Sequence, residues 1–341
     1  MTKDIKELAA WAQVLMLGLP GPRLDAVARE LVTDLKVGGV ILFARNIEEP
    51  RQVWELCRSL QELSLTATGQ PLFIAVDQDG GPVQRLKAPL TLIPSARSLG
   101  GSATPEQVRR LATQVGRELA RLGVNVNLAP VLDVAREPEC PLWERSYSSD
   151  PEQAAAMGVA AIQGYLAGGV IPVGKHFPGL GDTKRDSHVE LPQVLSNDPE
   201  RREDLWPFQR AVAAGVPMLM TAHVTVPAWD SFPATLSAVA IQERLRRGLG
   251  FEGVVITDDL EMGAIAQQAT VPAAALQTLR AGADLLLICQ DYQAAWHTAA
   301  LLKEQAPPQR LKEAAARLQR LRTGLAQPTP DVREIKNFVR G

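Results

Sequence analysis

The sequence contains few cysteines. Cys57, Cys140 and Cys289 are odd in number and far apart, and no two of them stand in a CxxC spacing. Such a set cannot build the disulfide framework of a small secreted domain. We therefore expect three reduced thiols and a cytoplasmic protein.

Long apolar runs and an excess of one charge are also absent. No run reaches 18 apolar residues, so we expect no membrane span. Lys and Arg number 36 against 38 Asp and Glu, a net charge of −2 that offers no basic field for nucleic acid. The apolar stretch 9–19 lacks a signal-peptide pattern, because Asp4 and Glu7 spoil the positively charged region before it and Gln13 interrupts the run. We expect a buried strand there and no export signal.

Histidine is scarce, and this argues against metal chemistry. The chain has four, His176, His188, His223 and His297, with no HxH and no HExxH. A barrel metallohydrolase normally needs paired histidines together with carboxylates. A Ser-His-Asp hydrolase would need a GxSxG turn, which is missing as well. We predict no metal and no other cofactor.

Eight short apolar runs recur along the 341 residues, and longer segments with helical signals separate them. The runs are continuous rather than alternating, as expected of strands that are buried on both faces. They cover residues 13–19, 39–43, 72–76, 124–130, 171–173, 218–221, 254–257 and 285–289.

The segments between the runs begin with clear helix starts. Thr104 is followed by Pro105 and by Gln107, which together make an N-cap, a first-turn proline and a capping box. The stretch from Asp150 to Gln153 repeats this pattern of a capping residue, a proline and a glutamine. Strand–helix alternation repeated eight times predicts an α/β protein with a single (β/α)8 TIM-like barrel. An open doubly wound sheet is the alternative, but no GxGxxG turn follows the first run. We assign residues 1–325 to the barrel and residues 326–341 to a C-terminal extension.

Polar residues stand directly after several of the apolar runs. In a barrel of this kind the carboxyl ends of the strands form the active-site mouth. Charged groups beside buried strands also need a partner or a ligand, since burying them is costly. These residues are Asp77, Asp79 and Arg85 after the third run, Asp133 after the fourth, Lys175 and His176 after the fifth, His223 after the sixth, and Asp258 and Asp259 after the seventh. For Asp133 and His223, support of the rim and contact with ligand both stay open.

A loop with glycine and proline breakers spans residues 175–188 and ends in Asp186-Ser187-His188. A carboxylate two residues before a histidine can accept the imidazole N–H and bring the ring into the range of a general acid. A simple turn with a solvated histidine is the plainer alternative. The charged rim from which the loop grows favours a functional role.

These residues resemble the glycoside hydrolase family 3 β-N-acetylglucosaminidases of the NagZ type. The pattern KHFPG-x-GDT-x-x-DSH at 175–188 is similar to that family's signature loop, and it is highly specific. Blocks at 77–81, 145–147, 220–223 and 253–262 match in the same order, so the similarity runs from about residue 15 to residue 289. The resemblance implies a single TIM-like barrel, in agreement with the strand count.

The resemblance also implies roles. Asp258 would be the nucleophile, with Asp259 as its competitor, and we expect only one of these neighbours to point into the mouth because side chains alternate along a strand. His188 and Asp186 would form the acid/base dyad. The terminal N-acetylglucosamine would be held by Asp77, Arg85, Arg145, Lys175 and His176. The expected substrate is a small carbohydrate, a muropeptide of peptidoglycan recycling, and no protein partner is indicated.

Three positions depart from the family pattern. Leu180 stands in place of a second histidine, Pro82 in place of arginine, and Asp79 in place of the more usual glutamate. Three rivals stay open: a phosphorylase, a β-glucosidase of the same superfamily, and a sugar-binding homologue without catalysis, for which Leu180 and Pro82 are the only support. The three departures themselves do not affect the implied nucleophile or the implied acid/base dyad.

Overall fold

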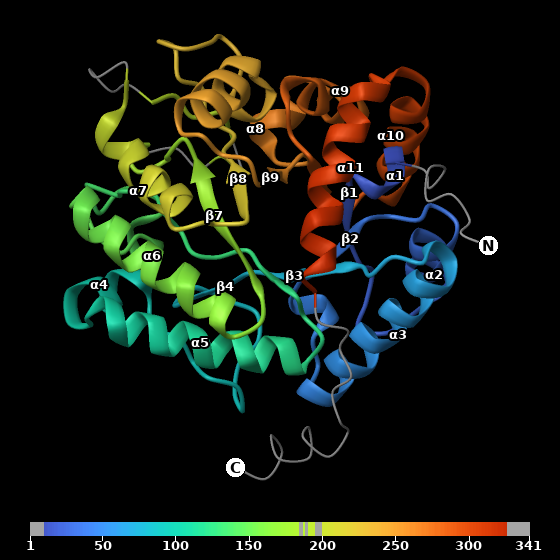
Figure 1. Cartoon of the computed structure of the whole chain (residues 1–341), viewed down its shortest axis with the longest axis horizontal. Helices are drawn as coiled ribbons and strands as arrows, with labels where there is room; N and C mark the ends of the chain where they lie inside the picture. Colours follow the sequence, from blue (N-terminus) through green and yellow to red (C-terminus); the bar gives the residue numbers. More distant parts are fainter. Residues whose placement is uncertain (1–9, 184–186, 188–189, 195–199, 326–341) are drawn as a thin grey trace.

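The computed structural model describes residues 10–183, 187, 190–194 and 200–325. Eight strands in this part close into one parallel barrel in the order β1-β10-β9-β8-β7-β6-β3-β2, which confirms the predicted TIM-like fold and excludes the open sheet. Figure 1 shows the strands at the centre and the helices around them. The barrel strands are β1 (Leu15–Gly18), β2 (Gly39–Leu42), β3 (Phe73–Val76), β6 (Val126–Asn127), β7 (Ile171–Phe177), β8 (Met218–Thr221), β9 (Val254–Asp259) and β10 (Leu285–Ile288).

Each expected run holds one of these strands, but two strands extend further than expected. β7 continues through Lys175 and His176 to Phe177, so the loop begins at Pro178 and not at residue 175. β9 likewise includes Asp258 and Asp259. A charged residue after an apolar run predicts the end of a strand, but these two strands continue. Lys175 of β7 pairs with Asp77, and Asp258 and Asp259 of β9 accept backbone N–H groups.

The helices cover the outside of the barrel. They are α1 (Ala10–Gln13), α2 (Ala26–Thr33), α3 (Pro50–Thr68), α4 (Ala96–Ser102), α5 (Pro105–Arg121), α6 (Pro151–Ala167), α7 (Arg202–Ala213), α8 (Gly263–Ala266), α9 (Val271–Ala281), α10 (Tyr292–Gln305) and α11 (Pro308–Thr323), with a π-helical turn at Val239–Gly248. Both predicted helix starts are confirmed. Thr104 and Gln107 form a capping box on α5, and Asp150 caps α6 with its side chain.

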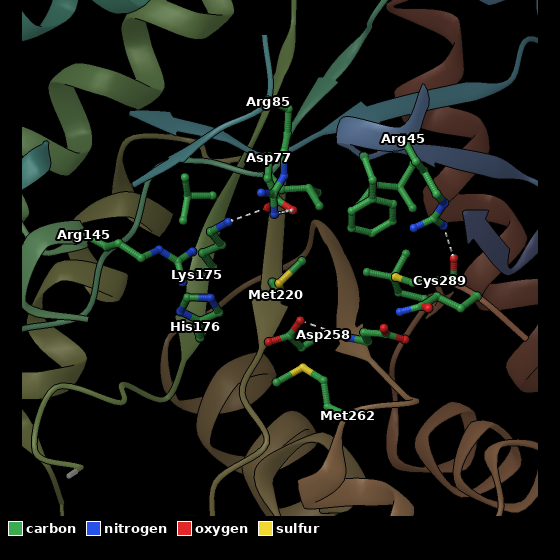
Figure 2. A pocket seen from close by; sticks show the side chains of 17 residues that line it. Arg45, Asp77, Arg85, Arg145, Lys175, His176, Met220, Asp258, Met262 and Cys289 are labelled. Atoms are coloured by element: carbon green, nitrogen blue, oxygen red, sulfur yellow. Dashed lines mark hydrogen bonds and ion pairs between the residues drawn. The ribbon is translucent and has the colours of Figure 1, made fainter. Parts of the chain in front are cut away.

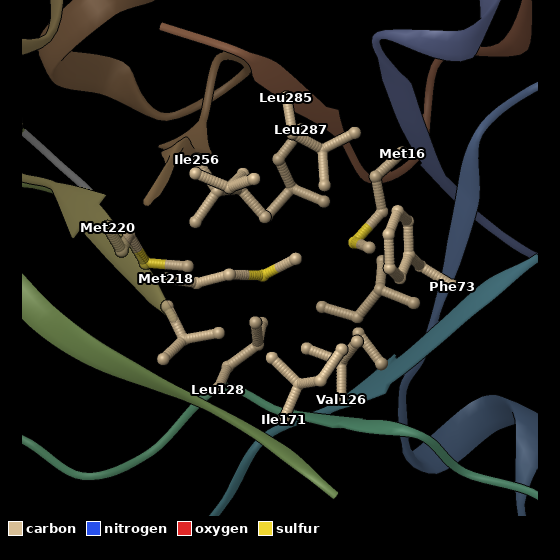
Figure 3. Packing of buried hydrophobic residues seen from close by; sticks show 14 of the residues in the cluster. Met16, Phe73, Val126, Leu128, Ile171, Met218, Met220, Ile256, Leu285 and Leu287 are labelled. Carbon is tan, nitrogen blue, oxygen red and sulfur yellow. The ribbon is translucent and has the colours of Figure 1, made fainter. Parts of the chain in front are cut away.

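Apolar side chains fill the inside of the barrel. Figure 3 shows Met16, Phe73, Met218, Ile256 and others from different strands meeting at the centre. Residues of β1, β2, β3, β8 and β10 are all buried, because helices cover the outer face and side chains pack the inner one. The centre is therefore a packed core, and ligand can enter only at an end.

The amino-terminal apolar stretch and the cysteines fall where the sequence placed them. Leu15–Gly18 is a buried strand of the barrel. Cys57, Cys140 and Cys289 are buried and free of disulfides. Among the described residues, no helix has the length and apolar character that crossing a membrane requires. Residues 326–341 lie outside the described part, so the proposed extension and its boundary stay predictions.

Candidate active site

A pocket of about 280 Å³ opens at the carboxyl ends of the strands. Six of the eight residues predicted for the site line it together (Figure 2). They are Asp77, Arg85, Arg145, Lys175, His176 and Asp258. Asp186 and His188 lie outside the described residues, so their placement stays a prediction.

A network of opposite charges forms one side of the pocket. Lys175 Nζ donates to Asp77 Oδ1 at 2.9 Å and lies 3.1 Å from Asp79 Oδ1, in a direction that makes an ion pair without a hydrogen bond. Arg145 donates through Nε and Nη2 to Asp79 Oδ2, at 3.0 and 2.7 Å. Asp79 thus holds both cations, and Arg85 approaches Asp77 to 3.8 Å from the other side.

The network keeps Asp77 ionised. Burial opposes ionisation of this carboxyl, but the charge and hydrogen bond of Lys175, followed by the charges of Arg145 and Arg85, outweigh it and lower the Asp77 pKa below its usual value. In the same way, burial works against the charge of Arg145, but Asp79 raises its pKa above the ordinary value. Fixed charges of both signs therefore face the pocket at neutral pH.

Asp133 holds His176 in place from behind. Its Oδ2 accepts from the backbone N–H of His176 at 3.1 Å and lies 2.7 Å from His176 Nδ1, and its Oδ1 accepts from the Leu180 N–H at 2.6 Å. The Asp133 carboxylate is fully buried and does not line the pocket. It orients the ring and, with Nδ1 bonded to it, leaves Nε2 as the nitrogen that can meet a ligand.

Asp258 and Asp259 both line the pocket, so the expectation that only one would face it is wrong. Their surroundings distinguish them instead. Asp258 Oδ1 accepts from the Asp259 N–H at 2.8 Å (Figure 2). Asp259 accepts from the Glu261 N–H at 3.1 Å, and burial raises its pKa to about 6 despite that bond. The Asp259 carboxylate is thus tied to the turn that follows it, and the choice of Asp258 as nucleophile continues to rest on the family motif.

His223 supports the rim without lining the pocket. It is fully buried; its Nε2 lies 2.7 Å from the backbone oxygen of Asp259 and its Nδ1 lies 2.9 Å from Thr235 Oγ1. In the described contacts, His223 and Asp133 both brace residues that face the pocket, which is the first of the two roles that the sequence left open.

The glycines of the 178–183 segment are required by its packing. Gly179 has φ +106°, a left-handed conformation that favours glycine, and a Cβ on Gly181 would meet the Val134 oxygen at 1.8 Å. Arg136 then ties this segment to α7, since its Nη1 donates to Asp182 and, at 2.8 Å, to Asp204. The start of the signature loop is therefore rigidly seated on the barrel.

The departures from the family pattern are structurally mild. Leu180 is buried in the core, and the bond to Asp133 uses its backbone, not its side chain. Pro82 is exposed in the turn between β4 (Gln78–Gly80) and β5 (Val83–Gln84). Asp79 is the acidic residue that forms ion pairs with both Lys175 and Arg145.

Several pocket residues were not predicted from the sequence. Phe43, Arg45, Met262, Cys289 and Gln290 line it, and they come from loops after β2, β9 and β10. Phe43 and Cys289 end apolar runs and the other three follow such runs, and only this position could have indicated them. Among the described residues, no three His, Cys, Asp or Glu side chains gather as a metal site would need.

Comparison with known proteins agrees with the barrel fold and with the family resemblance of the sequence. The family model for the glycosyl hydrolase family 3 N-terminal domain matches residues 2–321. A β-hexosaminidase of Alkalilimnicola ehrlichii is 40% identical over 291 residues, covering 82% of this chain and 81% of its own. One from Pseudomonas aeruginosa PAO1 is 38% identical over 302 residues, covering 87% and 89%.

Solved structures are similar too. A family 3 β-N-acetylglucosaminidase from Paenibacillus sp. FPU-7 superposes with a TM-score of 0.92 at 38% identity, covering 95% of this chain and 64% of that longer one. NagZ from Neisseria gonorrhoeae in complex with N-trifluoroacetyl-D-glucosamine superposes with a TM-score of 0.82 at 28% identity, covering 96% and 95%.

Proposed function

This chain belongs to glycoside hydrolase family 3 and is a glycoside hydrolase, and we propose that it is a retaining exo-β-N-acetylglucosaminidase. The observation that carries the proposal is the pocket itself. Asp258 lies in one small cavity with Asp77, Arg145, Lys175 and His176, as a nucleophile and a sugar clamp must. The names of the relatives support N-acetylhexosamine as the sugar.

In the proposed first step, the Asp258 carboxylate attacks the anomeric carbon and the bond to the leaving oxygen breaks. His188, oriented by Asp186, gives that oxygen its proton. Water then donates its proton to His188 and attacks the same carbon, which releases Asp258 and the sugar with retained configuration. The charged clamp positions the ring and strengthens its hydrogen bonds toward the transition state.

One described contact supports the placement of the dyad. Ser187, between the two dyad residues in the sequence, is buried, and its carbonyl accepts from the Ala264 N–H at 3.3 Å. Ala264 belongs to α8, which directly follows the turn after Asp258. The backbone between Asp186 and His188 thus lies on the nucleophile's side of the barrel.

The test is cleavage of p-nitrophenyl N-acetyl-β-glucosaminide in phosphate and in phosphate-free buffer. We expect equal rates and free N-acetylglucosamine in both. Release that requires phosphate would mean a phosphorylase, and faster release from the β-glucoside would mean a glucosidase. Sugar binding without cleavage of either substrate would mean a non-catalytic homologue.

We further propose that the natural substrates are cytoplasmic muropeptides of peptidoglycan recycling. The NagZ-like neighbour and the chemistry of the pocket support this. Mass spectrometry of N-acetylglucosaminyl-anhydromuramyl peptides incubated with the protein should show loss of one N-acetylglucosamine. Cell fractionation should find the protein in the cytoplasm, and recovery outside it would remove that part of the proposal.

A further inference from the structure

Two segments meet at the side of the pocket that carries Asp258. One is the nucleophile turn, residues 258–262, which follows β9; the other is the β10–α10 loop, residues 289–291. Asp258, Asp259 and Met262 of the first and Cys289 and Gln290 of the second line the pocket. In Figure 2, Asp258 and Cys289 lie on adjoining walls. The relative position of the two segments therefore sets the shape of this part of the site.

A single carboxylate joins them. Glu261 Oε2 accepts from the backbone N–H groups of Cys289 at 2.5 Å and Gln290 at 2.6 Å, and Oε1 accepts from that of Asp291 at 2.8 Å. These three donors precede α10, of which Asp291 is the N-cap, and the positive end of the helix dipole favours an anion at that point. Three charge-assisted hydrogen bonds from one side chain make a rigid joint.

The joint continues directly to the nucleophile. The Glu261 N–H donates to Asp259 Oδ1, and the Asp259 N–H donates to Asp258 Oδ1. The Leu260 N–H bonds to the Leu287 oxygen at 3.0 Å, so the turn is also in register with β10. A shift of the Glu261 side chain would move the backbone N–H that orients the Asp258 carboxylate.

We infer that Glu261 is a positioning residue for the nucleophile: its carboxylate fastens the nucleophile turn to the β10–α10 loop and so fixes the direction of Asp258. This inference rests on the proposed function. Glu261 is not part of the sugar clamp, because the clamp residues Asp77, Arg145, Lys175 and His176 belong to other strands and loops. Loss of Glu261 should slow attack without loosening the sugar.

The side-chain chemistry predicts how a substitution acts. In Glu261→Gln the amide keeps one oxygen, and its NH2 group faces at least one of the three backbone N–H donors without an acceptor. Glu261→Asp keeps the charge but withdraws the carboxylate by one methylene group. A displacement of about 1 Å at a reacting group can cost on the order of 100-fold in rate.

The experiment measures three quantities on the wild type, on Glu261→Gln and on Glu261→Asp. These are kcat and KM for the p-nitrophenyl substrate, the inhibition constant of free N-acetylglucosamine, and the rate at which a slow fluorinated analogue labels the enzyme. We expect kcat and the labelling rate to fall together by roughly 10- to 100-fold. KM and the inhibition constant should stay within about threefold, since the clamp is intact.

Glu118→Gln is the matched control. Glu118 on α5 accepts from the Thr91 N–H at 2.9 Å and from the Thr91 hydroxyl at 2.6 Å, so it also fastens a loop, but away from the pocket. We expect it to lower stability while leaving kcat within about twofold.

Each outcome decides between the claims. Active Glu261 variants with kcat and labelling within twofold of the wild type would overturn the inference. An equal loss of kcat in Glu118→Gln, or a parallel rise in the inhibition constant of the Glu261 variants, would do so too, since either would indicate a general structural effect. A wild type that neither cleaves nor becomes labelled would instead overturn the proposed function, and the inference with it.

Discussion

Asp79 should be essential to the sugar clamp although it is unusual for the family. Its side chain is 4% exposed and stands between Lys175 and Arg145, whose side chains are 2% and 15% exposed. Asp79→Asn keeps the shape but removes the charge. The new amide can take two orientations. Its NH2 group then lies beside either the Lys175 ammonium or the Arg145 guanidinium, and in both cases two hydrogen-bond donors face each other.

The expected cost follows from burial. Removing one partner of a buried charge network typically costs about 3–5 kcal/mol. For a chain of this length, that corresponds to a fall in Tm of about 5 °C. Because both cations line the pocket, we also expect KM to rise about tenfold, equivalent to about 1.4 kcal/mol of lost binding.

Differential scanning calorimetry and kinetics on the p-nitrophenyl substrate measure the two effects. Glu106→Gln is the control, since Glu106 pairs with Arg109 and Arg110 on the exposed face of α5, and it should leave Tm and KM unchanged. An Asp79→Asn protein with wild-type Tm and KM would show that the Asp79 carboxylate neither stabilises the fold nor positions Lys175 and Arg145 for the sugar.

Three further predictions concern the catalytic residues and their neighbour. Asp258→Ala should lower kcat by ~10⁴-fold or more with an unchanged circular dichroism spectrum, and near-normal turnover would remove Asp258 from the mechanism. His188→Ala should slow aryl glycosides with poor leaving groups more than those with good ones; equal slowing would count against an acid role. Burial raises the Asp259 pKa from 3.8 in the unfolded chain to about 6 in the folded protein. The folded protein therefore binds this proton more tightly, and the wild type loses stability as the pH rises from 3.8 through about 6. In urea unfolding, Asp259→Asn should therefore gain about 2 kcal/mol relative to the wild type between pH 4.5 and pH 7.5; a constant difference would contradict the raised pKa.

The barrel was predictable because its signals are local. Eight continuous apolar runs, separated by capped helices such as the one after Thr104, leave few arrangements that bury both faces of every strand. The strand ends were less predictable. β7 and β9 carry charged residues within the sheet. In β7 this depends on partners from elsewhere in the chain, since Lys175 pairs with Asp77 and His176 contacts Asp133.

The site divides in the same way. The sequence predicted that Asp77, Lys175, His176 and Asp258 share one pocket, and they do, because all four stand at or just after the carboxyl ends of barrel strands. The roles of Asp133 and Glu261 could not be predicted, because each depends on backbone N–H groups that lie far away in the sequence. Alternation along a strand failed for Asp258 and Asp259, which both line the pocket at the point where β9 ends.

The most direct test of the central claim is to trap the glycosyl–enzyme. The wild type would be incubated with a slow fluorinated N-acetylglucosamine analogue, digested with a protease, and analysed by tandem mass spectrometry. We expect one added sugar, attached to the side chain of Asp258. An adduct on Asp259 or on any other residue, or turnover of the analogue by an enzyme that never carries the sugar, would contradict it.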